Sequence, residues 1–137
     1  MNIADLNLES LQSLIDAAVF TLIWLVQLVI YPSFANIDAN KLIHWHGIYT
    51  FRVSFLIIPL MFAQLGLAVY FALNNPTFSS LSILVLIVSC WILTFVLSVP
   101  LHNKIQSGDA DSNTLKKLVT TNWPRTILWS LIFIFGL

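Results

Sequence analysis

The chain has 137 residues, of which 58% are hydrophobic and 9% are charged, and its formal net charge is zero. This composition excludes the strongly basic surface of a nucleic-acid-binding protein, and it is typical of an integral membrane protein. The chain has a single cysteine, Cys90, which excludes a disulfide framework, and we interpret it as a small packing residue.

Four apolar segments follow one another along the chain. Residues 17–37 carry no charged side chain, and neither do residues 53–103, a stretch long enough for two membrane crossings of about 20 residues each. Asn74, Asn75 and Pro76 interrupt the longer stretch with a turn signal. Residues 126–137 form the last uncharged run. We predict a single all-α domain over residues 1–137, an integral membrane four-helix bundle in up-down-up-down order, with helices at about 11–35, 42–73, 77–102 and 113–137.

The basic residues lie on one side of this predicted bundle. Both termini and the 74–76 turn would share one end, and the 36–41 and 103–112 loops would share the other. All six basic residues fall toward the second end: Lys41, Arg52, Lys104, Lys116, Lys117 and Arg125. The positive-inside rule then places both termini on the extracytoplasmic side of the inner (plasma) membrane. The acidic first segment lacks the basic flank of a secretory signal, so we expect the first helix to be retained.

The stretch HWHGIYTFR, residues 44–52, is not needed for the membrane crossing that follows it, because the residues after it are long enough to cross alone. Residues 53–73 alone span about 31 Å at about 1.5 Å per residue, which already covers the hydrocarbon core. The polar stretch is therefore expected to project into the cytoplasmic headgroup layer. Tyr31, Pro100, His102 and Asn103 should reach the same layer, so polar residues of separate helices converge near the cytoplasmic face.

The last helix places a charge inside the membrane. Residues 126–137 are about 18 Å long, too short to cross unless Asn122, Trp123, Pro124 and Arg125 belong to the same helix. A guanidinium at that depth costs about 3 kcal/mol. Arg125 either extends to the interface or bonds backbone carbonyls, or else it holds an anionic or carbonyl group of a bound molecule.

Pro124 leaves two structures open beside Arg125. It can break the last helix, with Asn122 as the cap and a positive helix terminus aimed at the layer of Arg125. Alternatively, it can be a kink that packing tolerates.

Two histidines are candidates for chemistry. His46 shares a helix face with Tyr49, and His102 ends a polar line that also contains Cys90, Thr94 and Ser98. Such small polar residues commonly form interhelical contacts. His46 and His102 have three interpretations: hydrogen bonds to lipid headgroups, ligation of a metal or haem from neighbouring helices, or general acid–base catalysis.

We therefore predict one cavity near the cytoplasmic face, lined by aromatic and basic side chains that include Trp45. The predicted catalytic residues are His46, His102 and Arg125, and the predicted ligand-binding residues are Tyr31, Tyr49, Arg52, Asn103, Asn122 and Trp123. A metal would be held by His46 and His102.

Three stretches carry a family resemblance: YPSF at 31–34, VPLHNKI at 99–105 and NWPRTILW at 122–129. They resemble small four-helix bacterial membrane proteins grouped with the anthrone oxygenase-like proteins. The resemblance implies oxygenase chemistry, without a defined cofactor, on a lipophilic substrate. The positions that match its pattern are Pro100, Asn103, Asn122, Trp123 and Arg125, whereas the histidines lie outside it.

Two classes of function follow. The first is a redox or oxygenase-like protein that binds a lipophilic molecule between its helices, such as a quinone, an aromatic compound or haem. The second is a non-enzymatic lipid-binding, transport or assembly subunit, whose interfacial aromatic residues only anchor it. The expected partners are the lipid bilayer and the small molecule, with a homo-oligomer left open and no nucleic acid.

Overall fold

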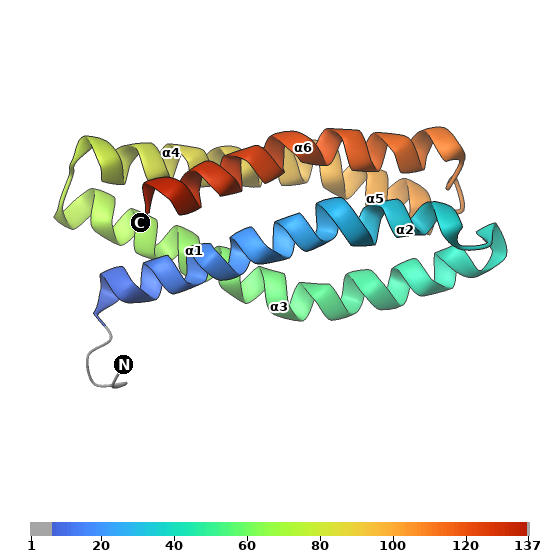
Figure 1. Ribbon diagram of the computed structural model, residues 1–137, viewed down its shortest axis with the longest axis horizontal. Helices are drawn as coiled ribbons and strands as arrows, with labels where there is room; N and C mark the ends of the chain where they lie inside the picture. The colour runs from blue at the N-terminus through green and yellow to red at the C-terminus, as the bar shows by residue number, and fades with distance from the viewer. Residues whose placement is uncertain (1–6, 137) are drawn as a thin grey trace.

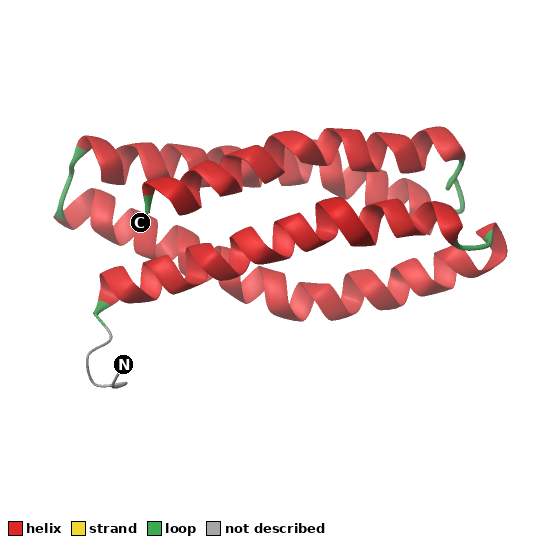
Figure 2. Cartoon of the chain, viewed as in Figure 1, coloured by secondary structure: helices red, strands yellow, loops and turns green. Residues whose placement is uncertain are grey.

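The computed structural model describes residues 7–136, and these residues form helices joined by short turns, with no strand among them (Figure 2). Turns at 37–38, 75–77 and 107–111 divide the described residues into four helical rods. The rods lie side by side (Figure 1). The predicted all-α fold with four helices is confirmed. The first rod consists of α1 (Leu8–Leu25), η2 (Val26–Ile30), α2 (Tyr31–Ser33) and η3 (Phe34–Asn36), and the second is α3 (Ala39–Asn74). The third rod consists of α4 (Phe78–Leu93), η4 (Thr94–Ser98) and α5 (Val99–Gln106), and the fourth is α6 (Ser112–Phe135).

Three of the rods are long and apolar enough to cross a membrane. They comprise Leu8–Asn36, Ala39–Asn74 and Phe78–Gln106, with 29, 36 and 29 residues. The fourth rod, α6, has 24 residues and is therefore about 36 Å long, but it is more polar. Large apolar side chains such as Phe55, Phe62 and Phe95 point outward and are more than half exposed, as expected for a surface that faces lipid.

The two ends of the bundle differ in charge. We call the end that carries the start of α1, the 75–77 turn and the last turn of α6 the terminal end, and Ser13 Oγ donates to the Gly136 carbonyl there at 3.3 Å. The opposite end, with the turns at 37–38 and 107–111, is the lysine end. Lys41 and Lys104 lie at this end, where they pair with Asp38 at 3.5 Å and with Asp109 at 3.6 Å.

Side-chain caps start three of the rods. Asn7 Oδ1 accepts the Ser10 N–H at 2.8 Å, and Thr77 and Ser80 form a capping box. Asp111 accepts the Thr114 N–H at 2.7 Å, and hydrogen bonds from Thr114 hold the pKa of the Asp111 carboxyl below its usual range. Because folding lowers this pKa, the cap contributes its full stabilisation at pH values above the ordinary carboxyl pKa. This stabilisation is lost as the pH falls through the lowered pKa.

Two of the rods contain one π-helical turn each, and in both cases a proline follows. The N–H of Tyr31 bonds the carbonyl of Val26, and the N–H of Val99 bonds the carbonyl of Thr94, five residues back instead of four. Pro32 and Pro100 have no N–H and crowd the preceding turn, and a widened turn accommodates them without breaking the rod.

Pro124 does not open a helix end, because α6 runs without interruption from Ser112 to Phe135. The predicted break, with Asn122 as its cap, is therefore wrong. The alternative, a proline that packing tolerates inside the helix, describes the structure.

Buried side chains form two apolar clusters along the bundle. The cluster toward the terminal end contains Ile15, Val19, Ile87, Trp129 and Ile132. The cluster toward the lysine end contains Tyr31, Phe34, Leu42, Ile105 and Leu118. Between them lies a buried polar layer of Gln27, Ser98, Asn122, Arg125 and Thr126.

Candidate functional site

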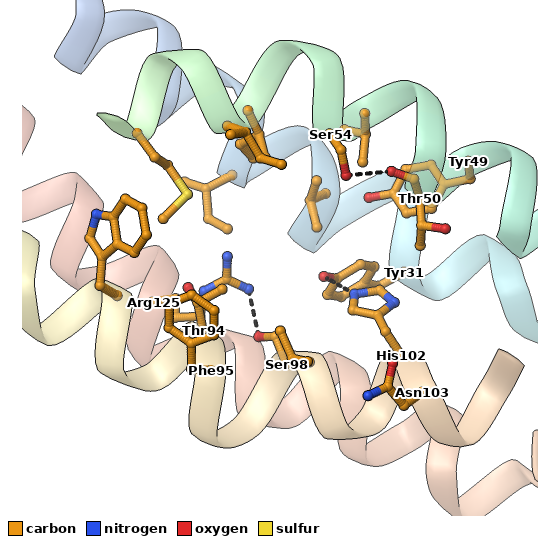
Figure 3. Close-up of a pocket in the computed structure, with 18 of the residues that line it drawn as sticks. Tyr31, Tyr49, Thr50, Ser54, Thr94, Phe95, Ser98, His102, Asn103 and Arg125 are labelled. Carbon is orange, nitrogen blue, oxygen red and sulfur yellow. Dashed lines mark hydrogen bonds between the residues drawn. The ribbon is translucent and has the colours of Figure 1, made fainter. Parts of the chain in front are cut away.

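A cavity of about 400 Å³ lies between α3 and the rod formed by α4, η4 and α5 (Figure 3). Its wall is mostly apolar, and its apolar lining includes Val53, Ile57, Met61, Phe62, Trp91 and Phe95. Phe62 and Phe95 at its rim are 60% and 59% exposed on the side of the bundle. The cavity therefore opens laterally, between two rods that are each apolar enough to span a membrane.

Arg125 extends from α6 into this cavity and is only 5% exposed. Its Nη1 donates to Ser98 Oγ at 2.7 Å and to Asn122 Oδ1 at 2.9 Å, and its guanidinium carbon lies 5.0 Å from the centre of the Trp129 ring. It forms no ion pair with any of the described carboxylates. Nor does it reach the interface or bond a backbone carbonyl of a described residue, as the first interpretation of its sequence position required.

The Arg125 guanidinium keeps unused hydrogen-bond donors. Its Nε is buried without a partner among the described residues, and its Nη2 makes no hydrogen bond to them. Figure 3 shows the guanidinium pointing into the cavity. The buried indole N–H of Trp91, which also lines the cavity, has no partner among the described residues. Arg125 and Trp91 thus carry hydrogen-bond donors that no described residue accepts.

A network of amide side chains holds Arg125 in place on the side away from the cavity. Asn122 Nδ2 donates to Gln27 Oε1 at 2.8 Å, so the Asn122 amide oxygen is left to face the guanidinium. Gln27 is held in turn, because its Nε2 donates to the Val119 carbonyl at 3.2 Å and its Oε1 accepts the Thr126 hydroxyl at 3.2 Å. The guanidinium is therefore oriented before any ligand binds.

A chain of hydrogen bonds runs from the cavity to the lysine end. Tyr31 Oη lies 2.9 Å from His102 Nε2, His102 Nδ1 lies 2.7 Å from His46 Nε2, and His46 Nδ1 lies 3.0 Å from Gln106 Oε1. Gln106 is exposed, whereas Tyr31 and His46 are 4% and 1% exposed. The chain therefore links a buried hydroxyl to the surface.

The exposed amide sets the direction of every proton in this chain. Gln106 Oε1 is an acceptor, so His46 Nδ1 carries a hydrogen and His46 Nε2 is an acceptor. His102 Nδ1 must then donate to His46, which leaves His102 Nε2 to accept the Tyr31 hydroxyl. Tyr31 and Arg125 both line the cavity.

The histidine geometry does not fit a metal ion or a haem. Each ring nitrogen of His46 and His102 already faces a hydrogen-bond partner, and the two rings bond each other at 2.7 Å with no room for an ion between them. Among the described residues, no group of three or more His, Cys, Asp or Glu side chains is placed to hold a metal. Of the three interpretations of the histidine pair, proton transfer is the one that this geometry fits.

The predicted site residues fall into three groups. Those that line the cavity are Tyr31, Tyr49, His102, Asn103 and Arg125. Two more lie behind this wall: His46, which bonds His102, and Asn122, which bonds Arg125.

The remaining predicted site residues lie elsewhere. Arg52 is exposed and does not line the cavity, and Trp45 is 47% exposed. Trp123 is 40% exposed and packs edge-on against Trp24. We therefore correct the expectation that all of these residues line one cavity.

Several residues of the site had no clear signal in the sequence. Ser98 accepts a hydrogen bond from Arg125 of α6, so the predicted interhelical contact is present, but the sequence does not show that its partner is Arg125, and Gln106 at the end of the histidine chain carries no signal at all. The pairs Tyr31–Pro32 and Val99–Pro100 carry a usable signal for these positions. Each pair follows a π turn, and the two turns set the positions of Tyr31, Ser98 and His102.

Comparison of the chain with protein-family models, with curated proteins and with solved structures finds no match. The resemblance to the anthrone oxygenase-like proteins therefore stays a prediction. The function has to be inferred from the geometry of the site.

Proposed function

We propose that this protein binds a flat lipophilic molecule with a carbonyl or phenolic oxygen, such as a quinone or an aromatic ketone, and exchanges a proton with that oxygen. The observation that carries the proposal is Arg125, a buried guanidinium without a described carboxylate partner, whose free donors face an apolar cavity. A ligand oxygen would accept the hydrogen bonds that the protein leaves unmade, and so offset the cost of burying the charge.

Cavity size and position favour this class of ligand. A volume of about 400 Å³ lies within the range of small-molecule sites. The lateral opening suits a molecule that arrives dissolved in the bilayer, and the aromatic side chains of Phe62, Trp91 and Phe95 suit a flat ring system.

The hydrogen-bond chain supplies a route for the proton. A phenolic ligand would give its proton to Tyr31 Oη while the Tyr31 proton moves to His102 Nε2 and the His102 Nδ1 proton moves to His46 Nε2. His46 then carries the added proton and releases one from Nδ1 to solvent beside Gln106, and Arg125 stabilises the oxyanion left on the ligand. Protonation of an oxyanion on the ligand would run through the same atoms in reverse.

This proton exchange changes no oxidation state by itself, and it would serve the oxidoreductase or oxygenase-like chemistry that the family resemblance implies together with an external electron carrier or oxidant. The alternative, a lipid-binding or transport protein without catalysis, also explains an apolar lateral cavity. It does not require a chain in which Tyr31, His102, His46 and Gln106 are joined end to end.

We further propose that the rods cross the inner (plasma) membrane in up-down-up-down order, with the lysine end in the cytoplasm. Support comes from the basic residues, since Lys41, Lys104, Lys116 and Lys117 all lie toward that end and no basic residue lies toward the other. A reporter fused after residue 137 is expected to be active outside the cytoplasm, and one inserted in the 107–111 turn is expected to be active inside. The opposite pattern would reverse the orientation and place the site near the outer face.

A titration with decylubiquinone tests the binding site. Trp91 lines the cavity, so a bound quinone should quench tryptophan fluorescence in a saturable way. Ser54→Phe fills the cavity, and because the Ser54 hydroxyl bonds only the Thr50 carbonyl of its own helix, the bundle should tolerate the change. We expect the dissociation constant to rise by about tenfold or more, which corresponds to about 1.4 kcal/mol.

Ser89→Phe is the matched control for this titration. Ser89 makes the same kind of bond to its own helix, to the Val85 carbonyl at 2.8 Å, but it does not line the cavity. Its affinity for decylubiquinone should stay within about twofold of the wild type, a negligible free-energy change. Quenching that rises linearly with quinone and is equal in all three proteins would mean that the quinone only partitions into lipid, and would contradict the proposal.

A further inference from the structure

A second buried ionisable group lies on α1, away from the cavity. Asp16 is 2% exposed and forms no ion pair with any described residue. Its carboxyl oxygens accept hydrogen bonds from Gln12 Nε2 at 3.0 and 3.1 Å and from Gln64 Nε2 at 2.6 Å. The side chain is thus held by two amides and by no cation.

The two amides differ in their freedom to rotate. Trp129 Nε1 can only donate, and it donates to Gln64 Oε1 at 3.2 Å, so Gln64 must keep its Nε2 toward Asp16. The Oε1 of Gln12, in contrast, is buried without a partner among the described residues. Apart from Asp16 itself, no described residue holds the Gln12 amide in one orientation, and half a turn about its last bond exchanges its donor for its acceptor at Asp16.

This arrangement satisfies both protonation states of Asp16. The ionised carboxylate accepts the amide hydrogens of Gln12 and Gln64, as drawn in the structure. The protonated acid has an O–H to donate, and the rotated Gln12 amide provides the acceptor. The Gln12 Oε1, which has no described partner beside the ionised carboxylate, would then accept the O–H of the acid.

A polar hollow at the terminal end gives access to this group. Its volume is about 420 Å³, and Gln12, Ser13, Asn75 and Gly136 are among its lining residues. Gly136 also covers the carboxyl group itself, because a Cβ added at Gly136 would lie only 3.1 Å from Asp16 Oδ2. The glycine lets the end of α6 approach Asp16 without a side chain between the carboxyl group and the hollow.

Few other charged groups face Asp16. From α3 it faces Gln64, and the nearest titratable group of α3 toward the terminal end, Tyr70, is exposed. From α6 it faces Trp129 and Gly136, and Arg125 lies on the ring of that tryptophan. The only titratable side chain of α4 is Cys90, and on α1 itself there is only the exposed Glu9.

We propose that Asp16 is a second proton-binding site, which exchanges protons with the terminal end of the bundle through the hollow beside Gln12, whose amide provides a hydrogen-bond partner for either protonation state. The histidine chain opens at the lysine end, so the protein would take up and release protons at both ends, with Arg125 between the two sites. The site does not depend on the proposed ligand, because every contact that defines it lies among residues of the chain.

Infrared difference spectroscopy of the protein in lipid nanodiscs tests the proposal. We expect a carbonyl band of a protonated carboxylic acid that titrates with pH and is missing from Asp16→Asn. Gln64→Leu removes a donor that stabilises the ionised carboxylate more strongly than the neutral acid, so its band should titrate about one pH unit higher or more. Gln12→Leu removes a partner of both states and should shift the titration less.

Two results would overturn the proposal. One is a spectrum without a titrating band assigned by Asp16→Asn; the other is an equal shift in Gln12→Leu and Gln64→Leu. A measurement on the unaltered protein covers the case in which the leucine variants do not fold. In vesicles of known orientation the band should follow the pH on the terminal side, and a band that follows only the pH on the lysine side would also contradict the inference.

Discussion

Replacement of Arg125 by leucine is expected to weaken decylubiquinone binding by at least about tenfold while the bundle still folds, since a hydrogen bond to a charged group contributes about 1.5–3 kcal/mol. The leucine also removes a buried charge that has no described carboxylate partner. We therefore expect a melting temperature equal to or above that of the wild type. The measurement pairs the fluorescence titration with thermal unfolding of the same preparation.

The variant Arg125→Lys tests whether the positive charge of Arg125 is sufficient for binding or whether the planar guanidinium is also needed. The ammonium keeps the positive charge but cannot present the planar fork that bonds Ser98 and Asn122 and still faces the cavity. Binding should therefore weaken in Arg125→Lys as well.

Arg52→Leu is the matched control, because this arginine is exposed, does not line the cavity and should not affect the affinity. If Arg125→Leu unfolds the protein while Arg125→Lys binds like the wild type, the arginine is structural and the site assignment fails.

Replacement of His102 by phenylalanine is expected to slow proton exchange with a bound phenol by about a hundredfold, the lower end of what general acid–base groups contribute. Phenylalanine keeps a ring in the cavity wall but removes both nitrogens that join Tyr31 to His46. The probe is 2-naphthol, whose absorbance changes when it ionises, followed after a rapid pH change. Its affinity should stay within about twofold of the wild type, because Arg125 still binds the oxygen.

The control for this experiment is His44→Phe, since His44 is an exposed histidine near the same end of the bundle and does not line the cavity. It should exchange protons at the wild-type rate. An unchanged rate in His102→Phe would show that protons reach the ligand by another route, and a large loss of affinity with no change in rate would make His102 a packing residue.

The sequence was sufficient to predict the four helices, because uncharged runs of this length have few structures other than a membrane-spanning helix. It left open whether Arg125 extends to the interface or stays in the bundle beside a bound molecule. The hydrogen-bond partners of Arg125 could not be predicted from the sequence in this way. Which of the neighbouring polar groups would bond Arg125 depends on helix rotation, and Ser98 and Asn122 reach it only because the rods pack as they do.

Helix rotation also explains the errors at Arg52 and Trp123. Both lie at the expected level of the bundle, but they project from the outer faces of α3 and α6. The hydrophobic pattern of a membrane helix is apolar on nearly every face, so it gives little information on which face is inside. His46, by contrast, is recognised as buried only when its contact with His102 is known.

The prolines are a second feature whose structural effect depends on helix packing and not on the sequence alone. Pro32 and Pro100 follow π turns that set the positions of Tyr31 and His102, whereas Pro124 lies inside an uninterrupted helix. All three read alike in the sequence. Whether a proline breaks a helix, widens a turn or is tolerated depends on how the neighbouring rods satisfy the freed carbonyl.

The central claim is that the lateral cavity holds a lipophilic molecule whose oxygen contacts Arg125. The most direct test is mass spectrometry of the small molecules extracted from protein purified out of its own membranes, for the wild type, Ser54→Phe and Ser89→Phe. We predict one aromatic or quinone-type compound in near-equal molar amount with the wild type and with Ser89→Phe, and its depletion from Ser54→Phe. Bulk membrane lipids alone, in the same proportions in all three preparations, would contradict the claim.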